Sequence, residues 1–310
     1  MQQHTVPTPY MVGDVHLYTT EIGGELVLFD TGPSTVAGLA YLQQHVELHR
    51  LRHVLVTHCH IDHYGLAGWL AQKTDAQIYL PRRDALKLQH HEKRLGHLQE
   101  LLRECGFSDE FLTGFRGSLG GDQVFPPEPH AYRIVEESDL PGRLGIEVLA
   151  CPGHSQSDLV YHCGDEAVSG DVLLRGIFQV PLLDVDLETF AGRFNNYRAY
   201  CATLLELAKL RGCRILPGHR RDVAGVDETI LGYVTKLLDR AARVRAFPAA
   251  LSVAEVVARL PGTDAPFIAY LKASEVLFMR DFLDDPERLR AALESIGLFA
   301  EIAPAYQAVA

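Results

Sequence analysis

Metal-binding chemistry is indicated by a dense group of side chains in the first third of the chain. His58, His60, Asp62 and His63 stand within the six-residue segment HCHIDH. Imidazole and carboxylate groups are ligands for zinc, iron and manganese. The alternative interpretation, a histidine-rich surface patch without a role, is disfavoured by the tight spacing. The segment therefore predicts part of a metal centre.

Further metal ligands are offered at three later positions, each of which follows a predicted strand. They are His154 in PGH (152–154), Asp171 in SGD (169–171) and His219 in PGH (217–219). A glycine before each ligand allows the backbone to turn sharply where the strand ends. One such tripeptide is usually only a turn, but three after successive strands are hard to explain as turns alone.

The elements that must position these residues alternate between strand and helix. Residues 51–58 are rich in β-branched and apolar side chains and predict a buried strand that ends at the histidine cluster. In an extended backbone alternate side chains share a side, so His58 and His60 can converge on one ion. As the chain then turns into a helix, Asp62 and His63 are directed toward a second position nearby.

The rest of the pattern indicates an α/β layered core. Further strands are predicted at 15–20, 25–30, 76–80, 146–150, 158–163, 166–171 and 213–216. Residues 82–119 are polar with helical spacing and are interpreted as a helical insertion. Apolar residues from 187 to 210 also recur at helical spacing, and beyond about residue 226 only helical patterns follow. We therefore expect a catalytic domain at 1–225 and a small helical C-terminal appendage at 226–310.

The order of these motifs resembles a known family. HxHxDH, PGH, GD and PGH, preceded by ELVLFDTGP (25–33), is similar to the pattern of the dinuclear metallo-β-lactamase superfamily. The resemblance covers about residues 10–222, and it implies a four-layer αββα sandwich with the metals at one sheet edge. By this resemblance the ligands form two sets that share a carboxylate: His58, His60 and His154 for the first ion, Asp62, His63 and His219 for the second, and Asp171 as the bridge.

The ligand set predicts hydrolytic chemistry. Two divalent ions, most simply zinc with iron or manganese as alternatives, can share a hydroxide because coordination lowers the pKa of water to roughly 7. That hydroxide would attack a carbonyl or phosphoryl centre while the ions stabilise the charge on oxygen. Asp62 is a candidate to orient the nucleophile or shuttle a proton. Asp30 is expected to support a ligand rather than act on the substrate.

Within the family, the layout is similar to glyoxalase II and to small bacterial thioesterase-like members. We therefore expect hydrolysis of an ester-like bond in a small acyl substrate, with a thioester ahead of a lactone or a simple ester. The alternatives are a phosphodiesterase and a non-hydrolytic di-iron oxygen or redox protein. Ile177, Phe178 and Leu182, which follow Asp171, either form a hydrophobic pocket beside the metals or pack under the helical insertion.

Composition limits the partners of the chain. The formal net charge of −11, with no block of Lys or Arg, argues against nucleic acid. No apolar run reaches the roughly 18 residues of a membrane span, and the first residues lack a secretion signal. The six cysteines are scattered without a CxxC pair, which favours reduced thiols and a cytoplasmic location. The oligomeric state is left open.

Overall fold

Two β-sheets form the centre of the computed structural model, which describes residues 1–119, 129, 131–263 and 265–310. The larger sheet has its strands in chain order: β1 (Gln2–Val6), β2 (Val15–Ile22), β3 (Glu25–Phe29), β4 (Leu51–Leu55), β5 (Gln77–Leu80) and β6 (Tyr132–Ile134). The smaller sheet has the order β10 (Arg214–Pro217), β9 (Glu166–Gly170), β8 (Leu159–Cys163) and β7 (Glu147–Ala150).

Strand direction decides where the loops gather. In the larger sheet β1, β2 and β3 are antiparallel, whereas β3, β4, β5 and β6 are parallel. In the smaller sheet β9 and β10 are parallel, and β7 and β8 complete an antiparallel ladder. Parallel neighbours end at the same sheet edge, so the segments after β3 and β4 leave together, as do those after β9 and β10. Ligands are commonly bound at such carboxyl ends.

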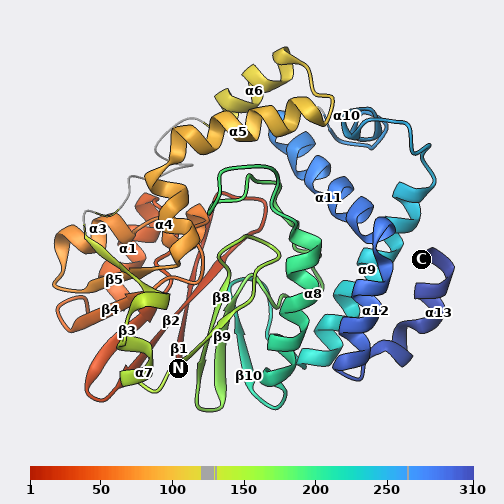
Figure 1. The fold of residues 1–310 in the computed structure, drawn as a ribbon. Helices are drawn as coiled ribbons and strands as arrows, with labels where there is room; N and C mark the ends of the chain where they lie inside the picture. Colours follow the sequence, from red (N-terminus) through yellow and green to blue (C-terminus); the bar gives the residue numbers. More distant parts are fainter. Residues whose placement is uncertain (120–128, 130, 264) are drawn as a thin grey trace.

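The sheets face each other, and helices cover both outer faces (Figure 1). Between the sheets, Phe29 and Tyr161 pack with ring centroids 5.4 Å apart. Outside the larger sheet, Leu70 of α3 (Ala67–Lys73) packs with Val54 of β4, beside α1 (Val36–His45). Outside the smaller sheet, Leu204 lies on α8 (Asn196–Leu207) in the same core as the strands. The predicted four-layer αββα arrangement is confirmed.

The remaining helices surround these layers. They are α2 (Ile61–Tyr64), α4 (Arg82–Gln89), α5 (His91–Glu104), α6 (Asp109–Leu119), α7 (Leu140–Arg143), α9 (Val226–Arg245), α10 (Val253–Val257), α11 (Pro266–Asp284), α12 (Pro286–Ser295) and α13 (Phe299–Val309), with 3₁₀ turns η1 (Val135–Glu137) and η2 (Ala208–Leu210). Helices α4, α5 and α6 occupy the range predicted as an insertion, and α9 to α13 the range predicted as an appendage. The division into domains stays a prediction.

The insertion and the tail meet above the sheets. Helices α5 and α6 run across the top of the molecule to α11 and α10, so the two regions form one arch (Figure 1). The Phe115 ring of α6 lies 4.9 Å from the Tyr270 ring of α11, measured between centroids. Lower in the tail, Phe278 and Leu289 share the core cluster of Leu204 and the smaller sheet. The C-terminal helices are therefore packed on both the insertion and the catalytic layers.

Three segments differ from the sequence-based expectations. β1 was not predicted, because its sequence QQHTV is polar and it is held by backbone pairing with β2. β4 ends at Leu55, before the histidines that were expected on its end. Residues 187–195 are not helical, because the Asp186 carboxylate accepts hydrogen bonds from the backbone N–H groups of Glu188 and Thr189 and forms a turn instead.

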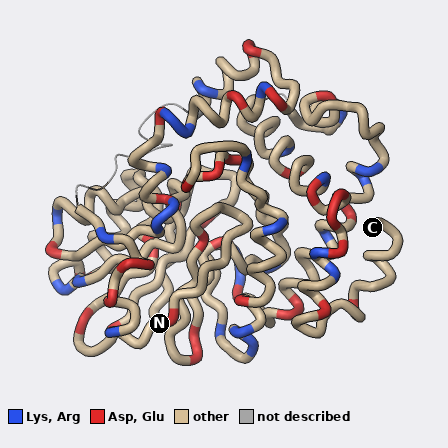
Figure 2. The backbone as a smooth tube through the Cα atoms, in the orientation of Figure 1, with Lys and Arg blue, Asp and Glu red and all other residues tan. Residues whose placement is uncertain are grey.

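Charge is spread along the chain. Lys and Arg alternate with Asp and Glu over most of the tube in Figure 2. Among the described residues, no helix has both the length and the apolar character needed to cross a membrane.

Candidate metal centre and adjoining pocket

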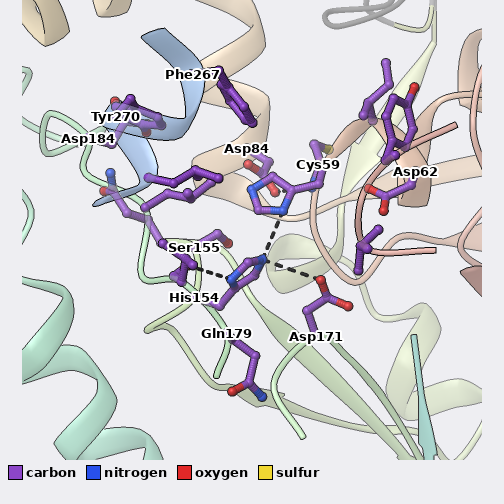
Figure 3. A pocket seen from close by; sticks show the side chains of 18 of the residues that line it. Cys59, Asp62, Asp84, His154, Ser155, Asp171, Gln179, Asp184, Phe267 and Tyr270 are labelled. Atoms are coloured by element: carbon purple, nitrogen blue, oxygen red, sulfur yellow. Dashed lines mark hydrogen bonds and ion pairs between the residues drawn. The ribbon is translucent and has the colours of Figure 1, made fainter. Parts of the chain in front are cut away.

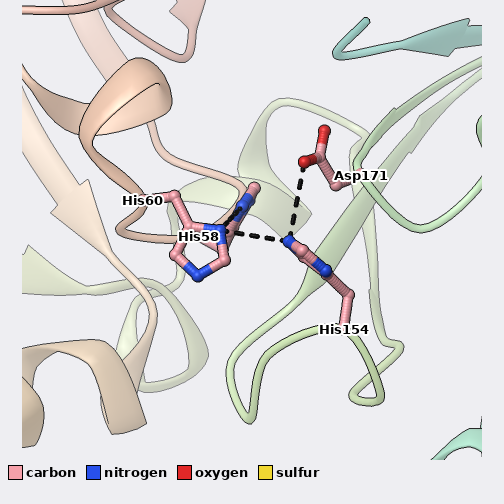
Figure 4. Close-up of side chains that lie close together, drawn as sticks. All are labelled: His58, His60, His154 and Asp171. Atoms are coloured by element: carbon pink, nitrogen blue, oxygen red, sulfur yellow. Dashed lines mark hydrogen bonds and ion pairs between the residues drawn. The ribbon is translucent and has the colours of Figure 1, made fainter. Parts of the chain in front are cut away.

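All seven predicted metal ligands converge at the edge where the strands of both sheets end. They form two groups, in each of which the candidate ligand atoms lie within 4.8 Å of one another: His58, His60, His154 and Asp171, and Asp62, His63 and His219. Figure 4 shows the four side chains of the first group pointing toward one another from three loops. The division matches the two sets that the family resemblance implies, while metal binding by each residue stays a prediction.

In the first group three imidazoles meet. His60 Nδ1 lies 2.9 Å from His58 Nε2 and 3.1 Å from His154 Nε2. Asp171 Oδ2 lies 3.5 Å from His154 Nε2. Imidazole nitrogens this close mark a position that a cation would share.

In the second group the facing atoms come from α2 and from the loop after β10. His63 Nε2 lies 3.3 Å from His219 Nε2, which is 3.2 Å from Asp62 Oδ2. Asp171 Oδ1 lies 3.4 Å from His63 Nε2 and 3.5 Å from His219 Nε2. Because Oδ2 faces the first group and Oδ1 faces the second, the Asp171 carboxylate stands between the two.

In four of the histidines, the outer ring nitrogen, Nδ1, faces away from the other candidate ligands and is held by an oxygen atom, as is usual for metal-binding histidines. The inner ring nitrogen, Nε2, faces the other candidate ligands. The pairs are His58 Nδ1 with Thr57 Oγ1 at 3.1 Å, His63 Nδ1 with Asp30 Oδ2 at 2.8 Å, His154 Nδ1 with the Val180 carbonyl at 2.9 Å, and His219 Nδ1 with the Asp14 carbonyl at 2.7 Å. Each outer nitrogen donates its proton to that oxygen. An inner nitrogen that carries no proton can then bind a cation. Burial lowers the pKa of His63 and of His219, but the surrounding carboxylates, Asp171 first among them, outweigh it and raise the pKa of both rings, so a cation bound there would replace a proton.

These residues fit a pair of divalent cations. Unprotonated imidazole nitrogens that face each other repel unless a cation lies between them. Asp171 Oδ1 is buried and accepts no hydrogen bond within the described part of the chain, although buried polar atoms are normally satisfied. Nitrogen and carboxylate donors together suit zinc, iron or manganese. Both the orphaned oxygen and the donor set are therefore explained by bound metal.

Burial and neighbouring charges together set the protonation states of these groups. It lowers the pKa of His58 and of His60 well below the ordinary histidine value, so that both imidazoles are neutral. Burial raises the pKa of Asp171, but the neighbouring His219 and His63 outweigh it and hold that pKa well below its ordinary range. Neutral imidazole and ionised carboxylate are the states that bind a metal ion.

Close contacts at Gly170 and Gly218 explain why the SGD motif and the second PGH motif need glycine before the ligand. A Cβ atom on Gly218 would lie 2.6 Å from His63 Cε1 and 2.9 Å from Asp171 Oδ1. Gly170 has a φ of +49° and its Cβ would lie 2.7 Å from Thr57 Oγ1. Any side chain at either position would push a ligand or its support out of place.

Asp30 supports the site from the loop after β3, as the sequence analysis expected. Its carboxylate accepts hydrogen bonds from Thr57 N at 2.7 Å, from Thr57 Oγ1 at 2.9 Å and from His63 Nδ1 at 2.8 Å. Its φ of +60° is unusual for a residue other than glycine, and such backbone costs about 1–3 kcal/mol. One carboxylate thus fixes the loop before His58 and the ring of His63.

Sequence reasoning missed a second support, which lies on α4. Asp84 Oδ2 accepts a hydrogen bond from Cys59 N at 2.5 Å, and Lys87 Nζ donates to the Cys59 carbonyl at 2.9 Å. The two side chains also pair with each other at 2.7 Å. Because β4 ends at Leu55, this clamp on Cys59, rather than a strand ladder, orients His58 and His60. The sequence shows only an acid and a base three residues apart, a common surface pattern.

A cavity of about 530 Å³ opens onto the metal centre. Figure 3 shows His154 and Asp171 at one end of this pocket and Phe267 and Tyr270 at the other. The far wall comes from the insertion and the tail: Leu98 on α5, Phe115 on α6, and Phe267, Tyr270 and Leu271 on α11. Ile177, Phe178 and Leu182 also line it, as the first of the two sequence-based alternatives expected. Leu182 packs in addition against the core cluster of the insertion, as the second expected.

Two of the cations that line this catalytic pocket, Lys87 and Arg94, are neutralised by partners. Lys87 pairs with Asp84 at 2.7 Å, and Arg94 Nε pairs with Asp184 Oδ2 at 2.7 Å. Tyr270 donates its hydroxyl to the Leu183 carbonyl at 2.6 Å. The surface that remains for a ligand away from the metal centre is therefore mainly apolar.

Comparison with curated proteins identifies metallo-hydrolases among the relatives. The probable metallo-hydrolase YqjP of Bacillus subtilis is 28% identical over 260 residues, which cover 77% of this chain and 77% of that protein. A hydroxyacylglutathione hydrolase of Methylobacillus flagellatus is 27% identical over 125 residues, which cover 40% of this chain and 34% of that enzyme.

Solved structures share the fold over most of the chain. A metallo-beta-lactamase family protein of Thermus thermophilus superposes with a TM-score of 0.70 at 22% identity, covering 92% of this chain and 93% of its own. A beta-lactamase domain protein of Burkholderia ambifaria gives a TM-score of 0.67 at 21% identity, covering 91% and 86%. A family model for the metallo-beta-lactamase superfamily matches residues 11–219, a span that contains every predicted ligand. The chain belongs to the metallo-beta-lactamase superfamily, and its relatives support a metal-dependent hydrolase.

Proposed function

We propose that this protein hydrolyses an ester-like bond in a small acyl substrate, and that a thioester is preferred over a lactone or a simple ester. The observation that carries the proposal is the apolar cavity that His60, Asp62, His154 and Asp171 line at one end. An acyl chain fits such a cavity because its burial is favourable by about 25 cal/mol for each Å² removed from water. Its carbonyl group then lies at the end where the metal ligands are.

Divalent ions held by the two groups would supply Lewis acidity, which would activate water and polarise a carbonyl group. The residues supply position. Asp62 is 7% exposed, lines the pocket and is held by His219, so it is the candidate to orient the attacking water or carry its proton. Water adds its oxygen to the carbonyl carbon, the carbon–sulfur bond breaks, and a proton from that water goes to the departing thiolate. The products are a carboxylic acid and a thiol.

Zinc is the proposed native metal, because the ligand set is mostly imidazole with carboxylates. Iron or manganese would use the same donors. The partial similarity to a hydroxyacylglutathione hydrolase, whose name describes thioester hydrolysis, supports the thioester. The paired charges of Lys87 and Arg94 disfavour a phosphoryl group inside the catalytic pocket. A small acyl compound is therefore the proposed partner, with no nucleic acid involved.

The test is a matched substrate panel on the metal-replete protein. Initial rates are measured for acyl thioesters, aryl esters, lactones and bis-p-nitrophenyl phosphate, together with metal content and oxygen consumption. The highest kcat/KM on a thioester supports the proposal, and a kcat/KM that rises with acyl length supports the apolar pocket. Preference for the phosphodiester would replace the proposal with the phosphodiesterase alternative. Iron with oxygen consumption and no hydrolysis would replace it with a redox role.

The role of Asp62 is tested in the same assay. Asp62→Asn keeps the shape of the side chain but removes its charge. At full metal occupancy we expect kcat on the best substrate to fall by 10²–10⁴-fold, which is the usual contribution of a proton-transferring group. A kcat equal to that of the unaltered protein would remove Asp62 from the proposed reaction.

A further inference from the structure

A second hollow lies beside the catalytic pocket, and its lining is strongly basic. It has a volume of about 810 Å³ and is lined by Arg175, Gly176, Ile177, Phe178, Arg220, Arg221, Lys236 and Arg240. Five of these residues are cationic, and they come from three separate segments: the loop after Asp171, the loop after His219, and helix α9. We call these five side chains and the space between them the basic hollow.

This concentration of positive charge stands out in an acidic chain. The protein carries 29 Lys and Arg against 40 Asp and Glu, and elsewhere its cations commonly pair with carboxylates, as Arg50 does with Glu21 and Glu47. Within the described ranges, Arg175, Arg220, Arg221 and Lys236 form no ion pair. Of the five cations, Arg240 does form an ion pair, with Glu275 at 3.6 Å, and Lys272 shares that carboxylate at the same distance.

Unpaired like charges around one space favour an anion there. Each cation raises the electrostatic potential at the others, and water and salt screen this repulsion only in part within a hollow. A ligand with several negative charges would relieve it. Arginine is also suited to phosphate, because its planar guanidinium can donate two parallel hydrogen bonds. The chemistry of the basic hollow is thus that of a phosphate-binding site.

The two cavities share a wall. Ile177, Phe178 and Arg220 line both of them. Arg240 is held on this wall, with its guanidinium carbon 4.3 Å from the centroid of the Phe178 ring, and Phe178 in turn stacks on Tyr233 with centroids 4.5 Å apart. The two cavities are therefore neighbours, and a molecule that reached past this shared wall would contact the metal centre and the basic hollow at once.

The backbone at the junction is constrained. Arg220 directly follows the ligand His219 and has a φ of +70°. Its carbonyl accepts a hydrogen bond from His16 Nε2 at 2.6 Å, which fixes this left-handed conformation. Backbone of this kind is costly for a residue with a side chain and is found most often at functional sites. The backbone of Arg220 is thus held in place within the same loop that carries the candidate ligand His219.

We propose that the basic hollow binds phosphate groups on the leaving portion of the substrate, while the acyl portion occupies the catalytic pocket. The substrate class is then an acyl thioester of a phosphorylated thiol, with coenzyme A as the probe of that chemistry. This inference rests on the proposed thioester hydrolysis. It adds a determinant of specificity that lies outside the metal centre and outside the apolar cavity.

The experiment compares two thioesters of the same acyl group, one of coenzyme A and one of N-acetylcysteamine, which lacks phosphate. The variants are Lys236→Glu and Arg221→Glu, which line the basic hollow but not the catalytic pocket. The matched control is Arg243→Glu, an exposed residue of α9 outside both cavities. We expect each hollow variant to lower kcat/KM for the coenzyme A thioester at least tenfold, mainly through KM. The N-acetylcysteamine thioester and the control should change less than twofold.

Other outcomes separate this inference from the proposed function. If wild type hydrolyses both thioesters with equal kcat/KM, the function stands and the inference is overturned. If neither thioester is hydrolysed, the function fails, and calorimetry with adenosine 3′,5′-bisphosphate tests the hollow alone. Binding by wild type and Arg243→Glu but not by Lys236→Glu supports a phosphate site. No binding at millimolar ligand overturns it.

Discussion

The two ends of the catalytic pocket are built in different ways. At the metal end, the ligands stand in short loops after strands, and backbone or carboxylate oxygens fix their rings, as Asp30 fixes His63. At the far end, the wall is made by side chains of α5, α6 and α11, which meet through ring contacts such as Phe115 with Tyr270. We therefore expect reactivity to depend on the sheet edge and substrate choice to depend on the helix side chains of the far wall. Changes at the first end should abolish activity, whereas changes at the second should redistribute it among substrates.

The largest effect is expected from Asp171→Ala at the metal end. This carboxylate faces both ligand groups, so its loss should weaken metal binding and lower kcat/KM about 1000-fold, or about 4 kcal/mol in the activation barrier. Metal analysis and steady-state kinetics measure both. Asp165→Ala, at an exposed carboxylate in the turn between β8 and β9, is the control. A tenfold loss or less would show that the two ends do not differ as described.

A buried ion pair at the far end of the pocket is expected to affect the stability of the fold rather than metal binding. Arg94 of α5 pairs with Asp184 at 2.7 Å, and both side chains are about 10% exposed. Arg94→Leu leaves the Asp184 carboxylate without its partner, so the free energy of unfolding should fall by about 3 kcal/mol. Metal content should not change. Urea denaturation measures the loss.

The double variant Arg94→Leu with Asp184→Asn separates charge from packing. The amide keeps the oxygen that accepts a hydrogen bond from Val185 N at 2.9 Å and removes the unpaired charge. At least half of the lost stability should return. If it does not, Arg94 acts through packing alone.

A smaller effect is expected from the clamp on α4. Lys87→Met removes the donor to the Cys59 carbonyl and the cation that pairs with Asp84, which keeps its hydrogen bond from Cys59 N. Groups that hold a ligand in place typically change metal affinity by about 10–100-fold, and we expect a loss in this range. Competition with a chelator gives the dissociation constant. Lys73→Met, on the exposed end of α3, should bind metal as tightly as wild type, and equal affinities for both variants would argue against the clamp.

The smallest effect is expected at the outer wall. Phe267 on α11 is 40% exposed and lines the pocket. Phe267→Ala should lower kcat/KM about fivefold for a long acyl chain, because about 1 kcal/mol of apolar contact is lost. An acetyl substrate should be unaffected, and so should metal content. An equal loss on both substrates would mean that Phe267 supports the fold rather than the chain-binding end.

The candidate ligands that converge at the metal end could be found in the sequence for a local reason. A ligand that follows a strand needs only a strand pattern and a turn residue nearby, and both are visible as in SGD and PGH. The clamp of Asp84 and Lys87 was not predicted, because its target Cys59 lies 25 or more residues away. The helical tail was predicted, but no motif indicated which side chains of α11 line the pocket. The basic hollow could not be seen, because Arg175, Arg220 and Lys236 come from three distant segments.

By itself, the sequence determined the layered α/β core and the metal-capable residues, since strand periodicity and short motifs depend on neighbours along the chain. Only the tertiary structure decided how Asp171 stands between two groups and how the insertion meets the tail. The same holds for the gathering of unpaired cations beside the pocket. These features arise from contacts between residues far apart in the chain, and such contacts are selected by packing and charge in three dimensions rather than by any local pattern.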